Sequence, residues 1–178
     1  MPDSRRIFFA LWPDEAVARQ FDEAGRCAHE TLGGRRMRRE TLHLTLAFVG
    51  SIATARLQAL CDIAAAVRLP AFALHFGRLE CLRRKKIAWA AADVPPGLHD
   101  LVRSLAAGMK AAGFRTEERP FAAHVTLLRH ARCEKARDLP AGDLRIEWPV
   151  RDFVLVESDL QPEGANYRIL GRWPLAQT

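Results

Sequence analysis

Apolar residues along this chain form two kinds of pattern, short runs typical of buried strands and spaced stripes typical of amphipathic helices. The runs predict strands over residues 7–12, 41–49, 72–76, 87–92, 121–128, 153–157 and 167–173. The stripes predict helices over residues 13–33, 54–67 and 95–113. Thr54 is placed to cap the second helix, and a polar stretch containing Pro140 and Gly142 separates the last two strands from the rest.

The order of these elements repeats once. Each half of the chain contains a strand, a helix and a further strand that carries His-x-Thr, first as His43-Leu44-Thr45 and then as His124-Val125-Thr126. The two motifs lie 81 residues apart. The repeat predicts two similar lobes related by a pseudo-twofold axis, with the motif strands facing each other across a cleft. Because no linker rich in Pro, Gly or Ser separates the lobes, we expect residues 1–178 to form a single domain.

The His-x-Thr strands carry the candidate chemistry. Strand side chains alternate between two faces, so His43 and Thr45 share one face while the leucines between and beside them share the other. His124 and Thr126 are arranged in the same way. Two imidazoles and two hydroxyls that face one cleft supply a paired acid and base beside two hydrogen-bond donors, which suits phosphoryl chemistry. The alternative is that both histidines are core residues that bond only to the backbone.

The other four histidines lack a Thr partner at this spacing and are weaker catalytic candidates: His29, His75, His99 and His130. Phe9 or Tyr167 could stack on a nucleobase, although aromatic residues in such segments usually belong to the core.

Composition describes an ordinary soluble globular protein. The 178 residues are 49% hydrophobic and 27% charged, and no apolar run reaches membrane-spanning length. The first residues lead straight into a predicted strand rather than a signal-peptide core, so we expect a cytoplasmic protein. The 27 basic residues, of which four are Lys, exceed the 21 acidic residues and give a net charge of +6. Arginine clusters at residues 35–39, and a mixed basic cluster at 83–86, either contact RNA phosphates or form a solvated basic surface.

The four cysteines are widely spaced and form no Cys-x-x-Cys pair: Cys27, Cys61, Cys81 and Cys133. This spacing indicates neither a zinc site nor a disulfide framework. We therefore expect free thiols, most of them packing residues, as is usual in the cytoplasm.

The chain resembles the two-histidine (2H) phosphoesterases, and within them the RNA 2′,3′-cyclic phosphodiesterases, historically called 2′-5′ RNA ligases. The resemblance runs nearly end to end and rests on residues 6–11, 40–50, 119–129 and 157–167. It implies an α+β, bilobal fold with two pseudo-symmetric antiparallel-sheet lobes, outer helices and a central cleft. The chain departs from the family pattern at Ala123, where Pro is usual, and in its more basic loop at 35–39.

The resemblance implies that a 2′,3′-cyclic phosphate at an RNA 3′ end is opened to a 2′-phosphomonoester. By similarity His124 is the base for water and His43 is the acid for the leaving oxygen, while Thr45 and Thr126 donate to the phosphate. Arg129 joins the phosphate site on family grounds alone, because strict alternation places it on the opposite face of its strand. We expect no metal ion and no cofactor.

Other functions stay open. One alternative is a non-catalytic nucleotide- or RNA-binding module, and another is a phosphodiesterase for a small cyclic nucleotide. Reversible 2′-5′ ligation of RNA ends is chemically allowed by microscopic reversibility. The expected partner is an RNA with a 2′,3′-cyclic phosphate end, tRNA-derived RNA among the candidates. We expect a monomer, with no membrane and no obligatory protein partner.

Overall fold

A computed structural model describes residues 4–117, 119–138, 144–161 and 164–176. Within these residues the strands form two antiparallel sheets, which we call sheet A and sheet B. Sheet A has the order β3-β1-β8-β9, from Leu44–Ala53, Ser4–Leu11, Asp152–Gln161 and Gly164–Pro174. Sheet B has the order β2-β6-β5-β4-β7, from Arg35–Arg36, His124–Arg129, Ile87–Ala92, Phe72–Leu82 and Ile146–Val150. The predicted α+β fold is therefore confirmed, with one His-x-Thr segment in each sheet.

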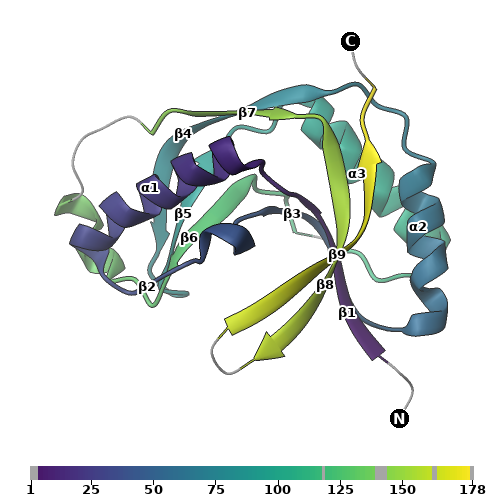
Figure 1. Ribbon diagram of the computed structural model, residues 1–178, viewed down its shortest axis with the longest axis horizontal. Helices are drawn as coiled ribbons and strands as arrows, with labels where there is room; N and C mark the ends of the chain where they lie inside the picture. Colours follow the sequence, from purple (N-terminus) through teal and green to yellow (C-terminus); the bar gives the residue numbers. More distant parts are fainter. Residues whose placement is uncertain (1–3, 118, 139–143, 162–163, 177–178) are drawn as a thin grey trace.

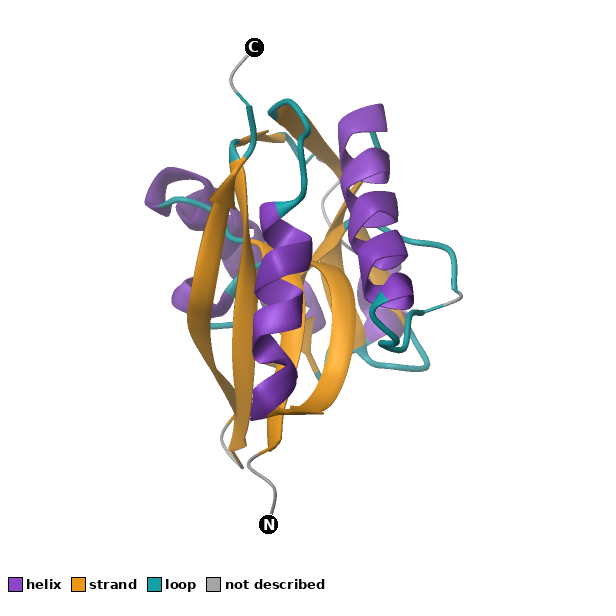
Figure 2. Cartoon of the chain, turned by 90° about the vertical axis from the view of Figure 1, so that its right-hand side faces the viewer, coloured by secondary structure: helices purple, strands orange, loops and turns teal. Residues whose placement is uncertain are grey.

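Three α-helices of the described chain cover the sheets, namely α1 (Glu15–Leu32), α2 (Leu57–Ala65) and α3 (Pro96–Ala111). Helix α1 follows a strand of sheet A but packs on β6 and β7 of sheet B. Helix α3 follows a strand of sheet B but packs on β3 of sheet A and on α2. Figure 1 shows α1 at one end of the molecule and α2 and α3 at the other, and Figure 2 views the molecule from the end that carries α2 and α3. Each half of the chain thus supplies a helix to the opposite sheet, which ties the two lobes together.

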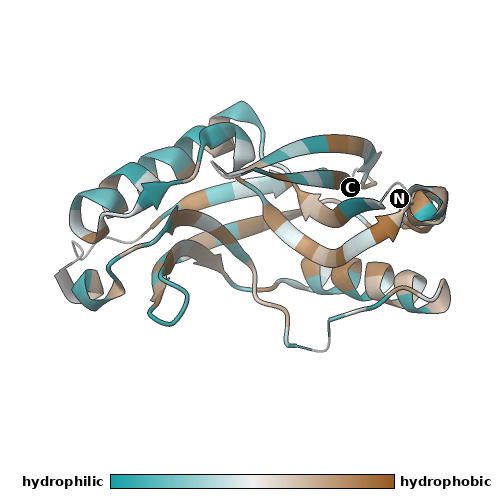
Figure 3. Ribbon diagram, turned by 90° about the horizontal axis from the view of Figure 1, so that it is seen from below, coloured by the Kyte–Doolittle hydropathy of each residue, from teal (hydrophilic) through white to brown (hydrophobic). Residues whose placement is uncertain are grey.

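The amphipathic patterns form the core as expected. Asp14 caps α1 by accepting a hydrogen bond from Val17 N at 2.9 Å, and the buried stripe of the helix includes Phe21. The larger cluster of buried apolar side chains contains residues from both sheets and from the three α-helices. The apolar side of α3 faces this core and the polar side of α1 faces outward, as the colouring in Figure 3 shows. A second, smaller cluster around Phe8 lies on the other face of sheet A.

Several boundaries differ from the expected ones. The strand expected at 41–49 begins at Leu44 and continues to Ala53, after a short 3-10 helix at Arg39–Thr41. The strand expected at 121–128 is His124–Arg129. Thr54 opens a 3-10 turn, Thr54–Arg56, and α2 starts only at Leu57 without a side-chain cap at Arg56. The expected polar stretch at Pro140 and Gly142 lies outside the described residues.

The expectation that every cysteine is a free thiol is wrong for Cys81 and Cys133, which form a disulfide. Cys81 lies near the end of β4, and Cys133 begins a 3-10 helix, Cys133–Asp138. After β6 the chain turns at His130, which has a positive φ of 57°, and Ala131 N donates to Lys86 O at 2.9 Å. This turn carries the chain back over β5 to β4, where Cys133 meets Cys81. The two cysteines are 52 residues apart, so the sequence alone does not indicate their contact. Cys27 and Cys61 are free.

Candidate active site

His43 lies at the entrance to β3, and its imidazole is held from one side by the backbone. Its Nδ1 is 2.7 Å from the carbonyl oxygen of Thr41. Because a carbonyl oxygen can only accept, Nδ1 carries the hydrogen and donates. Thr41 is buried, and its hydroxyl in turn donates to Arg38 O at 2.7 Å. This arrangement fixes the tautomer of His43 and leaves Nε2 as its reactive nitrogen.

His124 repeats this geometry in sheet B. It is the first residue of β6, and its Nδ1 donates to the carbonyl oxygen of Ala122 at 2.8 Å. In both motifs the carbonyl belongs to the residue two positions before the histidine, so the two rings are fixed in equivalent ways. Among the described residues the backbone binds only Nδ1 of each ring, which argues against the alternative that both histidines are core residues satisfied by the backbone.

The predicted motif residues line one cavity of about 1080 Å³ between the sheets, together with Arg129. The side chains that alternate with them are buried in the core, with Leu44 and Val125 fully inaccessible to solvent. The facing pattern read from the sequence is thus confirmed for both motifs. The predicted set that meets at this cavity is His43, Thr45, His124, Thr126 and Arg129.

Arg129 reaches the cavity because the pairing of β6 with β5 shifts by one residue. Thr126 pairs with Trp89, and Arg129 pairs with Ile87, so β6 uses three steps where β5 uses two. The extra residue, Leu127, leaves Arg129 on the same face as Thr126. Simple alternation, which placed Arg129 on the opposite face, is wrong here for that reason. Arg129 also helps to lower the pKa of His43.

The surroundings of His43 are aromatic. The Trp12 ring stacks on its imidazole, with centroids 5.1 Å apart and planes 4° from parallel. Phe8 lies 5.1 Å away, and Tyr167 meets the imidazole edge-on at 5.0 Å. Burial among these rings lowers the pKa of His43 to about 4, helped by the charge of His124 and opposed by the bond to Thr41. His43 is therefore neutral at pH 7 when the cavity holds no anion.

The surroundings of His124 are more polar. Only Trp89 packs on the ring within the described chain, at 4.2 Å between centroids, and its indole Nε1 donates to Glu80 at 3.1 Å. Burial lowers the pKa of His124 as well, and nearby Lys85 adds to this effect while Glu80 opposes it. A second, smaller pocket of about 300 Å³ lies beside His124, next to Trp89 and Glu80.

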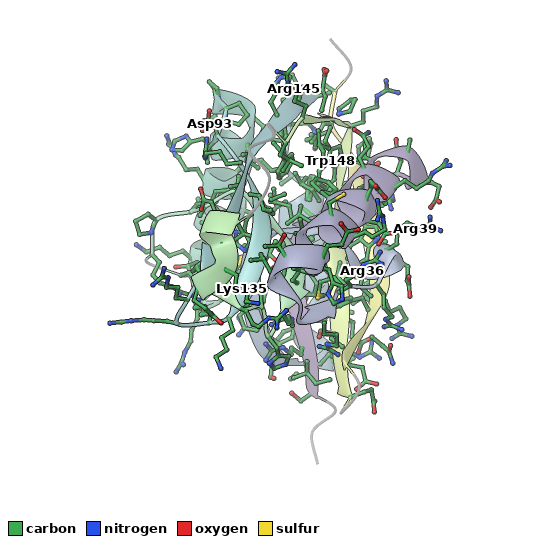
Figure 4. The ribbon with its side chains drawn as sticks, turned by 90° about the vertical axis from the view of Figure 1, so that its left-hand side faces the viewer. Arg36, Arg39, Asp93, Lys135, Arg145 and Trp148 are labelled. Carbon is green, nitrogen blue, oxygen red and sulfur yellow. A yellow bond between two sulfur atoms is a disulfide. The ribbon has the colours of Figure 1, made fainter. Side chains whose placement is uncertain are left out.

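The arginines of the basic cluster at 35–39 have different partners. Arg36 and Arg39 pair with Asp22 and Glu15 of α1, at 2.5 and 3.5 Å, and Figure 4 shows both arginines beside that helix. Arg38 instead reaches the β8–β9 hairpin of sheet A, where it donates to Ala165 O and Asn166 Oδ1. Arg35, Arg36 and Arg38 line the cavity, whereas Arg39 is not part of its lining.

Gly34 allows this cluster to approach the site. Its φ is +81°, and an added Cβ would lie 2.5 Å from the carbonyl oxygen of Arg129. Only glycine fits this conformation and this distance, so Gly34 lets β2 pair with β6 beside Arg129. In the other basic cluster, at 83–86, Lys85 lines the cavity from the β4–β5 turn.

Sequence reasoning missed the aromatic residues that contact the histidines, namely Phe8, Trp12 and Trp89. Both faces of β1 are apolar, so hydropathy alone does not separate Phe8, which faces the cavity, from Phe9, which is buried against Phe153. Of the two residues that the sequence suggested for stacking on a nucleobase, Tyr167 lines the cavity and Phe9 does not belong to its lining. His130 also lines the cavity, although it belongs to neither His-x-Thr motif.

No group of three or more His, Cys, Asp or Glu side chains lies close enough together to hold a metal ion in the part of the chain that the structure describes. Among the same residues, no helix is both long and apolar enough to span a bilayer.

Fold and site together define a two-lobed protein with one His-x-Thr segment on each side of a cavity, and comparison with known proteins agrees. Residues 13–162 match the model of the 2'-5' RNA ligase superfamily, and the chain belongs to this superfamily. Within it, the chain belongs to the RNA 2′,3′-cyclic phosphodiesterase family.

Individual relatives show how far this similarity extends. The RNA 2′,3′-cyclic phosphodiesterase of Escherichia coli is 30% identical over 99% of this chain and 100% of its own length. The protein of that name from Thermus thermophilus is 29% identical over 96% of this chain and 90% of its own length. The crystal structure of E. coli LigT complexed with 3'-AMP superposes with a TM-score of 0.85 at 28% identity, covering 98% of this chain and 100% of that one.

Proposed function

We propose that this protein hydrolyses the 2′,3′-cyclic phosphate at the 3′ end of an RNA, leaving a 2′-phosphomonoester, without a metal ion. One observation carries the proposal: two histidines, each with Nδ1–H held by a carbonyl, line one cavity with Nε2 as the reactive nitrogen. A pair fixed in this way can take one proton and give another in the same step. Membership of the RNA 2′,3′-cyclic phosphodiesterase family supports the same reaction.

The proposed step moves two protons and replaces one phosphorus–oxygen bond with another. Nε2 of His124 accepts a proton from water, and the resulting oxygen nucleophile forms a bond to phosphorus. The bond between phosphorus and O3′ breaks, and Nε2–H of His43 donates its proton to O3′. The products are a free 3′-hydroxyl and a 2′-phosphate, and the two histidines end with their protonation states exchanged.

Thr45, Thr126 and Arg129 are proposed to bind the non-bridging oxygens of the phosphate. Two hydroxyl donors and one guanidinium are the groups that stabilise negative charge on those oxygens in the transition state. The three side chains line the cavity from both sheets, since Thr45 belongs to β3 and the other two to β6.

The acid role is assigned to His43 by similarity to the family, and the surroundings of the ring set when it carries a proton. Burial keeps its ring neutral in the free protein, where its pKa is about 4. A bound phosphate anion raises that pKa, because the negative charge beside the ring stabilises the imidazolium. The proton thus enters with the substrate and is available for the leaving oxygen.

The cavity also favours a polyanion over a small cyclic nucleotide. Its volume of about 1080 Å³ exceeds what one nucleotide fills, and Arg35 and Lys85 extend its positive charge beyond the motif residues. Binding that depends on several phosphates weakens steeply with salt, whereas binding of a mononucleotide does not. We therefore propose an RNA end as the substrate.

The test is hydrolysis of a short RNA with a 2′,3′-cyclic phosphate in the presence of EDTA. His43→Asn and His124→Asn keep a donor near the position of Nδ1 and remove Nε2, so each lowers kcat by about 10²- to 10⁴-fold. His75→Asn, at an exposed histidine of β4, is the matched control and keeps full activity.

Separation of the 2′- and 3′-phosphate products identifies the leaving oxygen. No turnover by the unmodified protein while RNA still binds would overturn the proposal in favour of a binding module. Turnover of cyclic mononucleotides alone would instead point to a small substrate.

A further inference from the structure

The two His-x-Thr strands share more than the motif, because each contains an extra residue just after its threonine. In β3, Thr45 pairs with Ala10 and Phe48 pairs with Phe8, so three steps on β3 match two on β1. In β6 the same count separates Thr126 from Arg129. Phe48 therefore occupies in sheet A the position that Arg129 occupies in sheet B.

A cation is nevertheless present on the sheet A side. The guanidinium carbon of Arg6 lies 4.5 Å from the centroid of the Phe48 ring. Arg6 precedes Phe8 by two residues on β1, and both side chains line the cavity. The stack favours a position of the guanidinium above the ring, although the side chain is exposed.

Arg6 also differs from its neighbours in having no carboxylate partner among the described residues. Arg5, on the opposite face of β1, lies 3.6 Å from Glu157. Of the arginines near the site, Arg36 and Arg39 are paired with acids of α1. The charge of Arg6 instead acts on Tyr167, where it opposes the effect of burial on the pKa of that hydroxyl. A guanidinium without a counter-ion, at a cavity wall, is a site for an anion.

We propose that Arg6, seated on Phe48, binds the phosphodiester on the 5′ side of the terminal nucleotide. The proposed site of the scissile phosphate lies at the threonines and Arg129, and the Arg6 guanidinium lies over Phe48, three residues beyond Thr45. The next anion along an RNA chain is the phosphodiester that joins the last two nucleotides. This inference rests on the proposed function and adds a preference for an RNA end over a cyclic mononucleotide.

The test compares a nucleoside 2′,3′-cyclic phosphate with a dinucleotide that ends in the same group. Arg6→Ala lowers the ratio of kcat/KM for the dinucleotide to that for the mononucleotide by about tenfold. Arg19→Ala removes one positive charge from the exposed surface of α1 and leaves the ratio unchanged. A methylphosphonate at the internal linkage removes the anion, so it lowers the ratio for the unmodified protein and abolishes the effect of Arg6→Ala.

Binding gives a second readout that does not need turnover. The affinity for the dinucleotide product with a 2′-phosphate depends on salt, and Arg6→Ala reduces the slope of log Kd against log salt by about 0.7, the value for one phosphate on a single strand. An equal loss on both substrates, or no loss on either, would overturn the role of Arg6. If the unmodified protein hydrolyses neither substrate, the proposed function fails, while the salt slope still decides the fate of Arg6.

Discussion

The two walls of the cavity carry the same motif in different chemical settings. On sheet A, His43 lies among Phe8, Trp12 and Tyr167, and its pKa falls to about 4. On sheet B, Trp89 is the one aromatic neighbour of His124 in the described chain, and this wall includes cations from the β4–β5 turn and the end of β6. The backbone geometry is equivalent, so the difference lies in the side chains around each ring. One repeated unit can thus supply two unlike proton-transfer groups.

The largest expected effect comes from asking which wall supplies the acid. In a substrate whose 3′-oxygen is replaced by sulfur, the leaving thiolate needs no proton, because thiols are far more acidic than alcohols. We expect His43→Asn to recover to within about tenfold of the unmodified protein on this substrate, while His124→Asn stays about 10²- to 10⁴-fold slower. Single-turnover rates measure the effect. Recovery of His124→Asn instead would exchange the two roles.

The next effect concerns stability, because the disulfide joins two elements on the sheet B side. Reduction of Cys81–Cys133 opens a covalent loop with a sequence separation of 52 residues and lowers the free energy of unfolding by about 2–4 kcal/mol. Denaturant titration with and without dithiothreitol measures this. Hydrogen exchange is expected to rise in β4 and in residues 133–138, and to stay unchanged in β8 and β9.

The double variant Cys81→Ser/Cys133→Ser is the control, since it already lacks the bond. It should not respond to dithiothreitol. A response of similar size in that variant would assign the effect to Cys27 or Cys61 instead.

The smallest effect is the pH dependence of stability that the buried His43 on the sheet A wall produces. A folded-state pKa below the unfolded value of about 6.5 means that the unfolded chain binds the proton more readily. The stability contributed by neutral His43 is therefore full above pH 6.5 and is lost as pH falls from 6.5 towards 4, by up to about 3 kcal/mol. The unfolding free energy of His43→Asn should fall less over this window. An equal fall in both proteins would show that His43 does not carry the effect.

The sequence predicts much of the fold because most elements have a clear hydrophobic period. Strands and helices such as β1, β5, α1 and α3 all follow from it. Strand β2 is missed because its two arginines carry no apolar signal, and it forms only where Gly34 lets the chain approach β6. Strand β7 is missed because Pro149 interrupts it, yet it lies at the edge of sheet B, where a strand tolerates proline.

The site divides in the same way. The alternation rule identifies the histidines and threonines, because it requires only two residues of regular strand. It gives the wrong face for Arg129, because the extra residue Leu127 is apolar and buried like Leu128 beside it, and nothing in the sequence marks the shift. The aromatic surroundings of His43 come from β1 and β9, which are far from it in the chain, so only the folded structure brings them together.

The extra residue in each motif strand also changes what should be treated as one functional unit. The segment whose side chains reach the cavity is six residues long. Its sequence is His-x-Thr-x-x-Phe at 43–48 and His-x-Thr-x-x-Arg at 124–129. The two segments differ at the last of these six positions, which is the aromatic Phe48 in one and the cationic Arg129 in the other. A single deletion at Leu46 or Leu127 would leave the His-x-Thr letters intact and still turn that position away from the substrate. The two halves of this chain should therefore be aligned over all six residues and not over His-x-Thr alone.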